Sequence, residues 1–320
     1  MASREKIIAD LIEKNSPLIR KGFLLSIEKI KNEALVSEII RHLENNDVLA
    51  AVEAVGINRE AYRVFENSIL QAYESGGIAI AETFPVLNTP SGKKVFRFNI
   101  RNQASEAWLK NNSSRLITRI VDDQKTAIKV FMTEGMNAGR NPRSTALDIV
   151  GRVSRVTKRR EGGIIGLSSP QERVVANAKS QLESGDANQM RAYLTRNRRD
   201  RRFDSAVKKA IKEGKPLNKT TTGKAVGRYS DRLVQLRGET IARTESLNAL
   251  NRSQFDAFRQ AQETGGVGDI TREWDTAGDD RVRDVHRVMD GQRRGATEAF
   301  RSGTGSNLLH PGDTTQGAGA

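Results

Sequence analysis

Apolar residues recur at helical spacing over much of the chain. Residues 58–74 (NREAYRVFENSILQAYE) show this pattern, and Asn58 stands where a helix would be capped. The apolar positions that we expect to face a core are Tyr62, Val64, Phe65, Ile69, Leu70 and Tyr73. The spacing returns over residues 105–139, with an expected break at 111–113 and an end at Gly135 or Gly139. Its expected buried residues are Trp108, Leu109, Leu116, Ile120, Ile128 and Phe131.

Capping residues mark two further helix starts. Asn141 followed by Pro142 predicts one of them. In residues 169–182 (SPQERVVANAKSQL) we expect Ser169 as the N-cap, Pro170 at the first helical position and Glu172 completing a capping box. Residues 229–263 predict one long helix, preceded by a polar linker at 218–227 (NKTTTGKAVG).

Strand-like alternation is confined to short stretches. After a turn at Pro90 and Gly92, the apolar residues Phe96, Phe98 and Ile100 alternate with polar ones. Residues 269–274 (DITREW) predict a second strand. No apolar run approaches the roughly 20 residues that a membrane-spanning helix needs.

These elements predict a mostly α fold: a multi-segment helical protein with a small α+β C-terminal module. We expect three regions. Residues 1–140 form a helical N-terminal region with a short β-like insertion near 90–100, residues 141–228 a basic helical middle region, and residues 229–320 the C-terminal module with a polar tail.

The charge distribution adds a candidate partner. The formal net charge is +14, and residues 141–243 account for it with 24 basic and 10 acidic residues. Such a segment attracts polyanions such as double-stranded DNA, and phosphate contacts make that binding salt-dependent. A merely solubilising surface is the alternative. The expected DNA-contacting residues are Arg159, Arg160, Arg196, Arg198, Arg199, Arg201, Arg202, Lys208, Lys209 and Lys212.

Candidate chemistry gathers in residues 273–292 (EWDTAGDDRVRDVHRVMDGQ). Oxygen and nitrogen donors suited to a metal are Asp279, Asp280, Asp284, His286, Asp290, His310 and Asp313. The alternative is a salt-bridged helix start with Asp279 or Asp280 as N-cap. The chain has no cysteine, no glycine-flanked serine elbow and no complete phosphate-binding loop. We therefore expect no catalytic residue, no metal, no cofactor and no enzyme activity.

Read in order, several segments resemble the Mu F-like minor head proteins of tailed phages, also called phage head morphogenesis proteins. The resemblance rests on residues 237–261 (RGETIARTESLNALNRSQFDAFRQA), residues 273–292, Phe300, and HPGD at 310–313. Residues 162–182 and 199–211 also look like the family's central region, so the resemblance runs from about residue 141 onward. The family-motif residues, for which we expect a structural role, are Arg243, Glu245, Asn248, Trp274, Asp280, His286, Asp290 and His310.

The resemblance implies a virion component present in few copies, made in the host cytoplasm and located at the portal vertex or in the capsid interior. The implied partners are the portal protein, the major capsid or scaffolding protein, and packaged double-stranded DNA contacted non-specifically, with no membrane during assembly. Some members are thought to leave the head with the DNA. Members commonly continue into a Cys-x-Cys ending; this chain has no cysteine, which weighs against a metal held by His286 or His310.

Two alternatives stay open. One is an enzyme: a metal-dependent nuclease using Asp280, Asp284 and His286, or an ADP-ribosyl transferase. The transferase would be expected to show a Glu-x-Glu or Gln-x-Glu turn, which the C-terminal third lacks. The other alternative is a free-standing DNA-binding protein.

Overall fold

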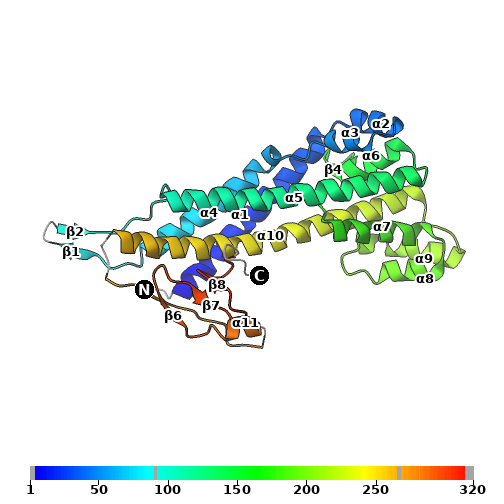
Figure 1. Ribbon diagram of the computed structural model, residues 1–320. Helices are drawn as coiled ribbons and strands as arrows, with labels where there is room; N and C mark the ends of the chain where they lie inside the picture. The colour runs from blue at the N-terminus through cyan, green and yellow to red at the C-terminus, as the bar shows by residue number, and fades with distance from the viewer. Residues whose placement is uncertain (1–3, 90–91, 265–267, 281, 314–320) are drawn as a thin grey trace. The chain divides into compact units, whose positions relative to one another are not determined.

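The computed structural model describes residues 4–89, 92–264, 268–280 and 282–313 (Figure 1). Its helices are α1 (Arg4–Glu33), α2 (Val36–Glu44), α3 (Val48–Glu53), α4 (Arg63–Ala81), α5 (Gln103–Asn137), α6 (Pro142–Val150), α7 (Ser169–Glu183), α8 (Ala187–Leu194), α9 (Asp204–Glu213), α10 (Lys219–Glu263) and α11 (Asp284–Arg287), with 3-10 turns η1 (Arg59–Tyr62) and η2 (Arg201–Phe203).

Strands are short and form only two-stranded antiparallel sheets in the described part of the chain. The pairs are β1 (Leu87–Thr89) with β2 (Gly92–Lys94), β3 (Arg152–Val153) with β4 (Arg160–Glu161), β5 (Thr271–Glu273) with β6 (Arg293–Gly295), and β7 (Phe300–Arg301) with β8 (Asn307–Leu308). The predicted class, mostly α with a small α+β C-terminal module, is confirmed. None of the described helices is long and apolar enough to cross a membrane.

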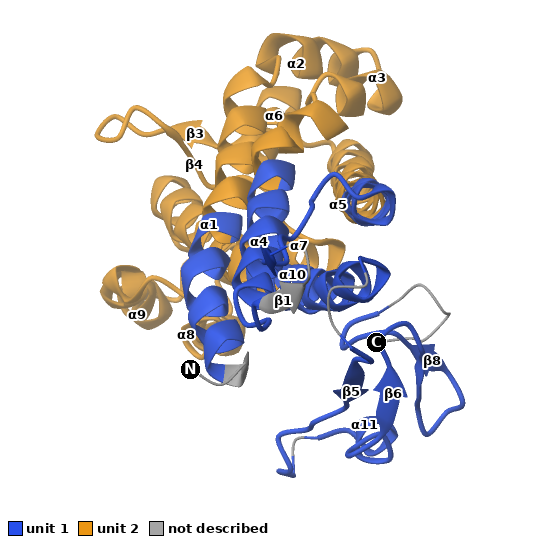
Figure 2. Ribbon diagram, turned by 90° about the vertical axis from the view of Figure 1, so that its left-hand side faces the viewer, with its two compact units in different colours: residues 1–19, 66–113, 241–320 blue, residues 20–65, 114–240 orange. Residues whose placement is uncertain are grey.

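Two compact units make up the fold, and each is assembled from separated stretches of the chain (Figure 2). Unit 1 comprises residues 1–19, 66–113 and 241–320, and unit 2 comprises residues 20–65 and 114–240. The boundary predicted at 228/229 falls inside α10. The division at 140/141 stays a prediction from composition.

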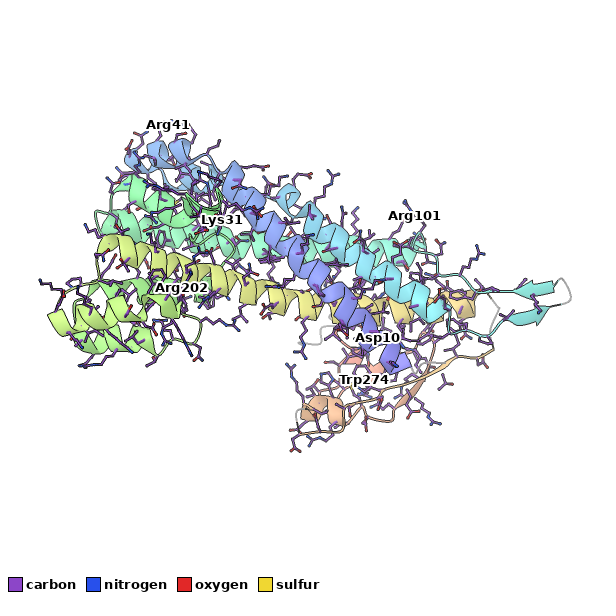
Figure 3. All side chains as sticks on the ribbon, turned by 180° about the vertical axis from the view of Figure 1, so that it is seen from behind. Asp10, Lys31, Arg41, Arg101, Arg202 and Trp274 are labelled. Carbon is purple, nitrogen blue, oxygen red and sulfur yellow. The ribbon has the colours of Figure 1, made fainter. Side chains whose placement is uncertain are left out.

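The core of unit 2 is built on aromatic contacts and on a glycine-rich connector. Phe23 packs edge-on against Phe65, with ring centroids 5.8 Å apart. In the connector, Gly162 lies so close to α10 that a Cβ there would stand 2.7 Å from Gly227 Cα. The buried Lys31, labelled in Figure 3, donates to the Gly162 carbonyl at 2.7 Å. Only a residue without a side chain fits this approach.

The predicted helix caps are confirmed in two places and shifted in a third. Asn58 accepts from the Ala61 amide at 3.1 Å, and Asn141 accepts from the Ser144 amide at 3.2 Å. Before α7, however, Ser168 rather than Ser169 is the N-cap, and its amide donates to Gln171 Oε1 at 3.1 Å. The prediction of Ser169 with Glu172 is therefore wrong by one residue.

Burial along α4 and α5 follows most of the predicted pattern. In the first predicted helix, Tyr62, Phe65, Ile69 and Tyr73 are buried, whereas Val64 and Leu70 are 49% and 39% exposed. All six residues predicted to be buried on α5 are buried. The predicted break at 111–113 is wrong, because α5 runs through it and buries Asn112 and Ser113.

Two further local predictions are wrong. The polar linker at 218–227 is helical, since Asn218 Oδ1 accepts from the Thr221 amide at 2.9 Å and starts α10. The β-like alternation at 96–100 is not a strand; the hairpin lies just before it, and Pro90 at the predicted turn is outside the described residues. Phe96 and Phe98 pack instead against the unit 1 cluster of Ile80, Ala257 and Phe258.

Candidate functional site

The C-terminal module of unit 1 is organised by its two small hairpins. Register pairs Arg272 with Arg294 across β5 and β6, and Phe300 with Leu308 across β7 and β8. The predicted strand at 269–274 is confirmed as β5. The buried residues that the hairpins and the intervening loop bring together are Trp274, Met289, Phe300 and Leu308.

His286 is part of this packing. Its ring stacks on Trp274, with centroids 6.0 Å apart and planes 5° from parallel, and Trp274 in turn meets Phe300 edge-on at 5.2 Å. The Nδ1 atom of His286 is buried and has no hydrogen-bond partner among the described residues. The histidine therefore covers an aromatic side chain on the module's core.

The aspartates around His286 serve the loops rather than a common centre. Asp280 is exposed, and Asp284 has a 95% exposed side chain 3.4 Å from Arg287. Asp290 Oδ1 accepts from the backbone amide and the hydroxyl of Thr276, both at 2.8 Å. The described residues contain no group of three or more His, Asp or Glu side chains that could hold a metal.

The helix start predicted at Asp279 or Asp280 is wrong. The helix α11 begins at Asp284 and lasts a single turn, and Arg283 occupies its N-cap position in an extended conformation. Asp280 lies outside the helix, so it does not share a helical face with Asp284.

His310 is more deeply buried than His286 and closes a turn. It is 3% exposed, and its Nδ1 lies 2.9 Å from the Pro311 carbonyl oxygen. Burial lowers the pKa of His310, so the ring is held neutral. Asp313 Oδ2 accepts from the Leu309 amide at 3.0 Å, and the Asp313 amide donates to the His310 carbonyl at 3.1 Å. The HPGD segment is thus a hydrogen-bonded turn.

Arg272 is the residue of the module that the sequence reasoning missed. Its guanidinium donates to the Gly295 carbonyl at 3.1 Å and also to the carbonyls of Glu298 and Leu309. It lies 5.0 Å from the ring centroids of Phe255 and Phe300, and burial lowers its pKa to about 10. Strand alternation offered a signal, because Arg272 in β5 and Trp274 just after it are two residues apart and both are buried.

The segment of α10 that carries the motif residues contributes polar side chains to the interior of unit 1, although Arg243 itself does not. Arg243 is exposed, Glu245 is buried, and Asn248 Nδ2 donates to Asn112 Oδ1 at 3.3 Å. Further along, the fully buried Asp256 accepts from Tyr73 at 2.6 Å and from Arg252 Nε at 2.8 Å. The motif therefore ties α4, α5 and α10 together within this unit.

The arginine run after α8, in unit 2, holds its own loop in place. Arg196 donates to Gln181 at 2.9 Å and to Asn177 at 3.1 Å, and its guanidinium lies 5.6 Å from the Tyr229 ring centroid. Arg199 grips Asp204 with two hydrogen bonds of 3.0 and 2.9 Å. These two side chains therefore stabilise the loop.

Arg202 fixes the same loop in another way. It binds both oxygens of the buried Asp200, and hydrogen bonds from Arg202 lower the pKa of this carboxyl to about 2. Most of the Arg202 side chain nevertheless remains in solvent, at 73% exposure.

The other candidate cations face solvent to differing degrees. Arg198, Arg201, Lys208 and Lys212 are exposed, and no ion pair of theirs is found among the described residues. Lys209 is also exposed and lies 3.8 Å from Glu213. Arg159 pairs with Glu28 at 3.3 Å, and the half-buried Arg160 donates to the Gly151 carbonyl at 3.1 Å.

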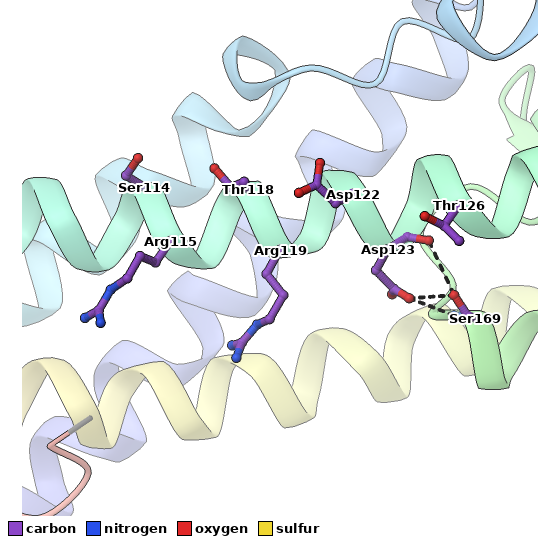
Figure 4. A pocket seen from close by; sticks show the side chains of 8 residues that line it. All are labelled: Ser114, Arg115, Thr118, Arg119, Asp122, Asp123, Thr126 and Ser169. Atoms are coloured by element: carbon purple, nitrogen blue, oxygen red, sulfur yellow. Dashed lines mark hydrogen bonds between the residues drawn. The ribbon is translucent and has the colours of Figure 1, made fainter. Parts of the chain in front are cut away.

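A hollow of about 630 Å³ lies along α5 in unit 2 (Figure 4). Its lining residues are Ser114, Arg115, Thr118, Arg119, Asp122, Asp123, Thr126 and Ser169. Asp123 accepts from the hydroxyl of Ser169 at 2.6 Å and from Arg237 at 3.1 Å. Asp123 therefore holds the start of α7, and the lining contains no histidine or cysteine.

Comparison with known protein families identifies part of the chain. Residues 201–313 match the family described as phage Mu protein F like protein, which covers η2, α9, α10 and the C-terminal module. No curated protein and no solved structure matches the chain. Since the match begins at residue 201, the resemblance expected for residues 141–200 stays a prediction.

The matched family is one of phage head morphogenesis proteins, which are generally structural components of the virion rather than enzymes. The match includes all eight motif residues named from the sequence, from Arg243 to His310. The resemblance of this chain to the Mu F-like proteins is thereby confirmed over residues 201–313.

Proposed function

We propose that this protein is a minor head protein of a tailed phage, acting in head assembly at the portal vertex or the capsid interior and contacting packaged DNA non-specifically. The observation that carries the proposal is the match of residues 201–313 to the Mu F-like family. The packing of His286 and His310 agrees with it, because both rings serve the fold of the matched module.

The support for DNA contact is the placement of exposed cations in unit 2. On α9, Val207 and Ala210 are buried while Lys208 and Lys212 are exposed, so one face packs and the other presents charge. The neighbouring Arg198 is exposed as well. Lysine and arginine contacts to phosphate release counterions, which gives affinity without sequence preference.

An inventory of the mature particle tests the assembly role. We expect the protein in purified virions at low copy number, and co-purification of the full chain with portal protein or procapsids. Its absence from both virions and procapsids would contradict the proposal. Tight DNA binding with no capsid partner would instead favour a free-standing DNA-binding protein.

A charge-matched pair of triple variants tests the DNA contact. We expect Arg198→Gln with Lys208→Gln and Lys212→Gln to reduce the slope of log K against log salt by about 0.9 for each phosphate that is no longer neutralised. The control replaces Lys93, Lys94 and Arg97, two exposed lysines and one exposed arginine, with glutamine. Equal reductions in the two variants would show a general effect of net charge and would remove unit 2 as the contact surface.

A further inference from the structure

The β3–β4 hairpin of unit 2 forms a projecting arm, defined here as residues 152–161 (Figure 2). Its turn is closed by backbone hydrogen bonds from Ser154 to Arg159 at 2.8 Å and from Lys158 to Ser154 at 2.9 Å. Thr157 adds a hydroxyl hydrogen bond to Glu161 at 2.9 Å. Lys158 takes a left-handed conformation, with φ of 58°, to make this turn. The arm is thus an ordered ribbon.

The base of the arm is fixed to the unit by glycines. A Cβ on Gly151 would stand 2.7 Å from the Gly162 carbonyl, and one on Gly163 would stand 2.5 Å from the Ile149 carbonyl. The Gly162 amide donates to both oxygens of Asp231, at 2.9 and 3.0 Å. A hairpin held this closely at its base keeps its direction when a partner binds, which lowers the entropic cost of binding.

The tip of the arm is unusual in what it exposes. Val156 is 90% exposed, the highest value among the large hydrophobic residues of the described chain, and Val153 is 59% exposed. Arg155 and Lys158 flank Val156 and are exposed, with no side-chain partner found in the described part of the protein. Neither the valines nor these two cations contribute to the core of unit 2.

We propose that the arm binds duplex DNA, with the ribbon in the major groove, Val156 against the base edges and Arg155 and Lys158 on the flanking phosphates. The inference rests on the DNA contact of the proposed function. It adds a contact element separate from the cations of α9 and assigns Val156 to it.

Charge and shape both select this partner. The ten residues of the arm carry five cations and one carboxylate, Glu161. The major groove of B-DNA, about 12 Å wide, admits a two-stranded ribbon, and apolar side chains there contact thymine methyl groups. The exposed ion pair of Arg159 with Glu28 is weak enough to exchange for phosphate.

Fluorescence anisotropy of the full chain with a 30-base-pair duplex, measured at several salt concentrations, tests the arm. Val156→Ser is expected to weaken binding about tenfold, through partial loss of apolar burial, and to leave the salt slope unchanged. Arg155→Gln with Lys158→Gln is expected to lower the slope by about 0.9 for each phosphate that is no longer neutralised. The controls are Val130→Ser, an exposed valine on α5, and Lys93→Gln with Arg97→Gln, for which we expect less than about a twofold change.

The outcomes separate this inference from the proposed function. If the arm variants bind DNA as the wild type does while the Arg198, Lys208 and Lys212 variant loses affinity, the arm is wrong and the DNA contact of unit 2 stands. If the wild type does not bind DNA at all, the arm and the DNA contact of unit 2 both fail, whereas the assembly role is decided by the particle inventory. Arm-dependent binding to anionic phospholipid vesicles, with DNA binding independent of the arm, would overturn the inference in favour of a lipid surface.

The groove assignment has its own test. A duplex whose major groove is filled by glucosylated 5-hydroxymethylcytosine should bind the wild type and Val156→Ser equally, because the base edges are covered. A persistent tenfold difference on that duplex would remove the arm from the major groove. Equal thermal unfolding midpoints for all variants show that the tip substitutions leave the fold intact.

Discussion

Each of the two units buries a carboxylate on a helix, and the two carboxylates differ in their neighbours. In unit 1, Asp256 is fully buried, and its Oδ2 accepts from Tyr73 and Arg252. Its Oδ1 has no hydrogen-bond partner among the described residues, but the Arg259 guanidinium lies 3.3 Å from it. In unit 2, Glu172 is 4% exposed, and its Oε1 atom has no hydrogen-bond partner among the described residues. Burial, followed by the charge of Glu134, raises the pKa of Glu172 to about 6.

The difference is that Asp256 is paired with two arginines, whereas Glu172 is enclosed by packing and no ion pair of its carboxylate is found among the described residues. Asp256 lies in the stretch of α10 that matches the Mu F-like family, and its partner Arg252 also covers the Trp108 ring at 5.7 Å. Glu172 lies at the start of α7, where Gln171 makes the capping contact. A buried charge therefore indicates a structural role through its partners, since burial alone is unfavourable.

Removing the carboxylate of Asp256 should have the largest effect on stability. We expect Asp256→Ala to lower the free energy of unfolding by about 3 to 5 kcal/mol, because the buried Arg252 loses its counter-charge and Arg259 loses the buried one of its two carboxylate neighbours. Equilibrium denaturation in urea, followed by circular dichroism, measures the loss.

The matched control is Glu263→Ala, which removes the exposed carboxylate that lies near Arg259. Arg259 Nε lies 3.7 Å from Glu263, whose side chain is 54% exposed. Such a pair contributes at most about 1 kcal/mol. Similar losses in the two variants would show that the polar core of unit 1 is not the source of its stability.

Neutralising Glu172 should raise the free energy of unfolding, whereas removing the Asp256 carboxylate should lower it. The folded pKa of about 6 lies above the ordinary value of 4.5, so protonation favours the folded state. That stability is fully present below pH 4.5 and is lost as the pH rises through 6. We expect Glu172→Gln to be more stable than the wild type by about 2 kcal/mol above pH 6, since each pKa unit corresponds to about 1.4 kcal/mol.

Denaturation at pH 4 and pH 7 measures this effect. The control is Glu183→Gln, at the exposed end of the same helix, for which we expect the same stability as the wild type at both values. A Glu172→Gln variant that is less stable at pH 7 would show that the carboxylate has a favourable partner in the folded protein.

The position of Glu172 also shows what the sequence could not reveal. Two serines precede Pro170, and either one could cap α7 by local rules. The choice is made at a distance, because the Ser169 hydroxyl donates to Asp123 on α5, which leaves Ser168 to cap. Asn58 and Asn141 could be predicted because each caps within three residues of its own position.

The sequence also does not reveal where a side chain, rather than another strand, hydrogen-bonds to the backbone. Residues 96–100 read as a strand, yet the Asn99 amide and carbonyl pair with the Gln260 side chain of α10 at 2.8 and 3.0 Å. The segment is extended without a neighbouring strand. Local alternation identifies an extended segment, but the partner that satisfies its backbone comes from tertiary structure.

The candidate site also combines features that the sequence predicts with features that only tertiary structure determines. The resemblance to the Mu F-like family could be predicted from the order of motifs in the sequence, and the family match confirms that resemblance over residues 201–313. The sequence could not show that His286 stacks on Trp274 or that Arg199 is bound to Asp204, because both depend on how loops fold back. Residue type alone could not distinguish Arg199, which binds Asp204 within the protein, from Arg198, which faces solvent.

The smallest expected effect comes from single hydroxyl groups, and it tests whether partners decide the value of a buried polar atom. Burial raises the pKa of Tyr73, so its hydroxyl stays protonated and donates to Asp256. Tyr193 in unit 2 is equally buried, but its hydroxyl has no hydrogen-bond partner in the part of the chain that the structure describes. We expect Tyr73→Phe to cost about 1.5 kcal/mol and Tyr193→Phe to be neutral or slightly stabilising, as measured by urea denaturation. Equal costs would mean that packing of the rings alone sets the stability, and that the polar core around Asp256 adds nothing to unit 1.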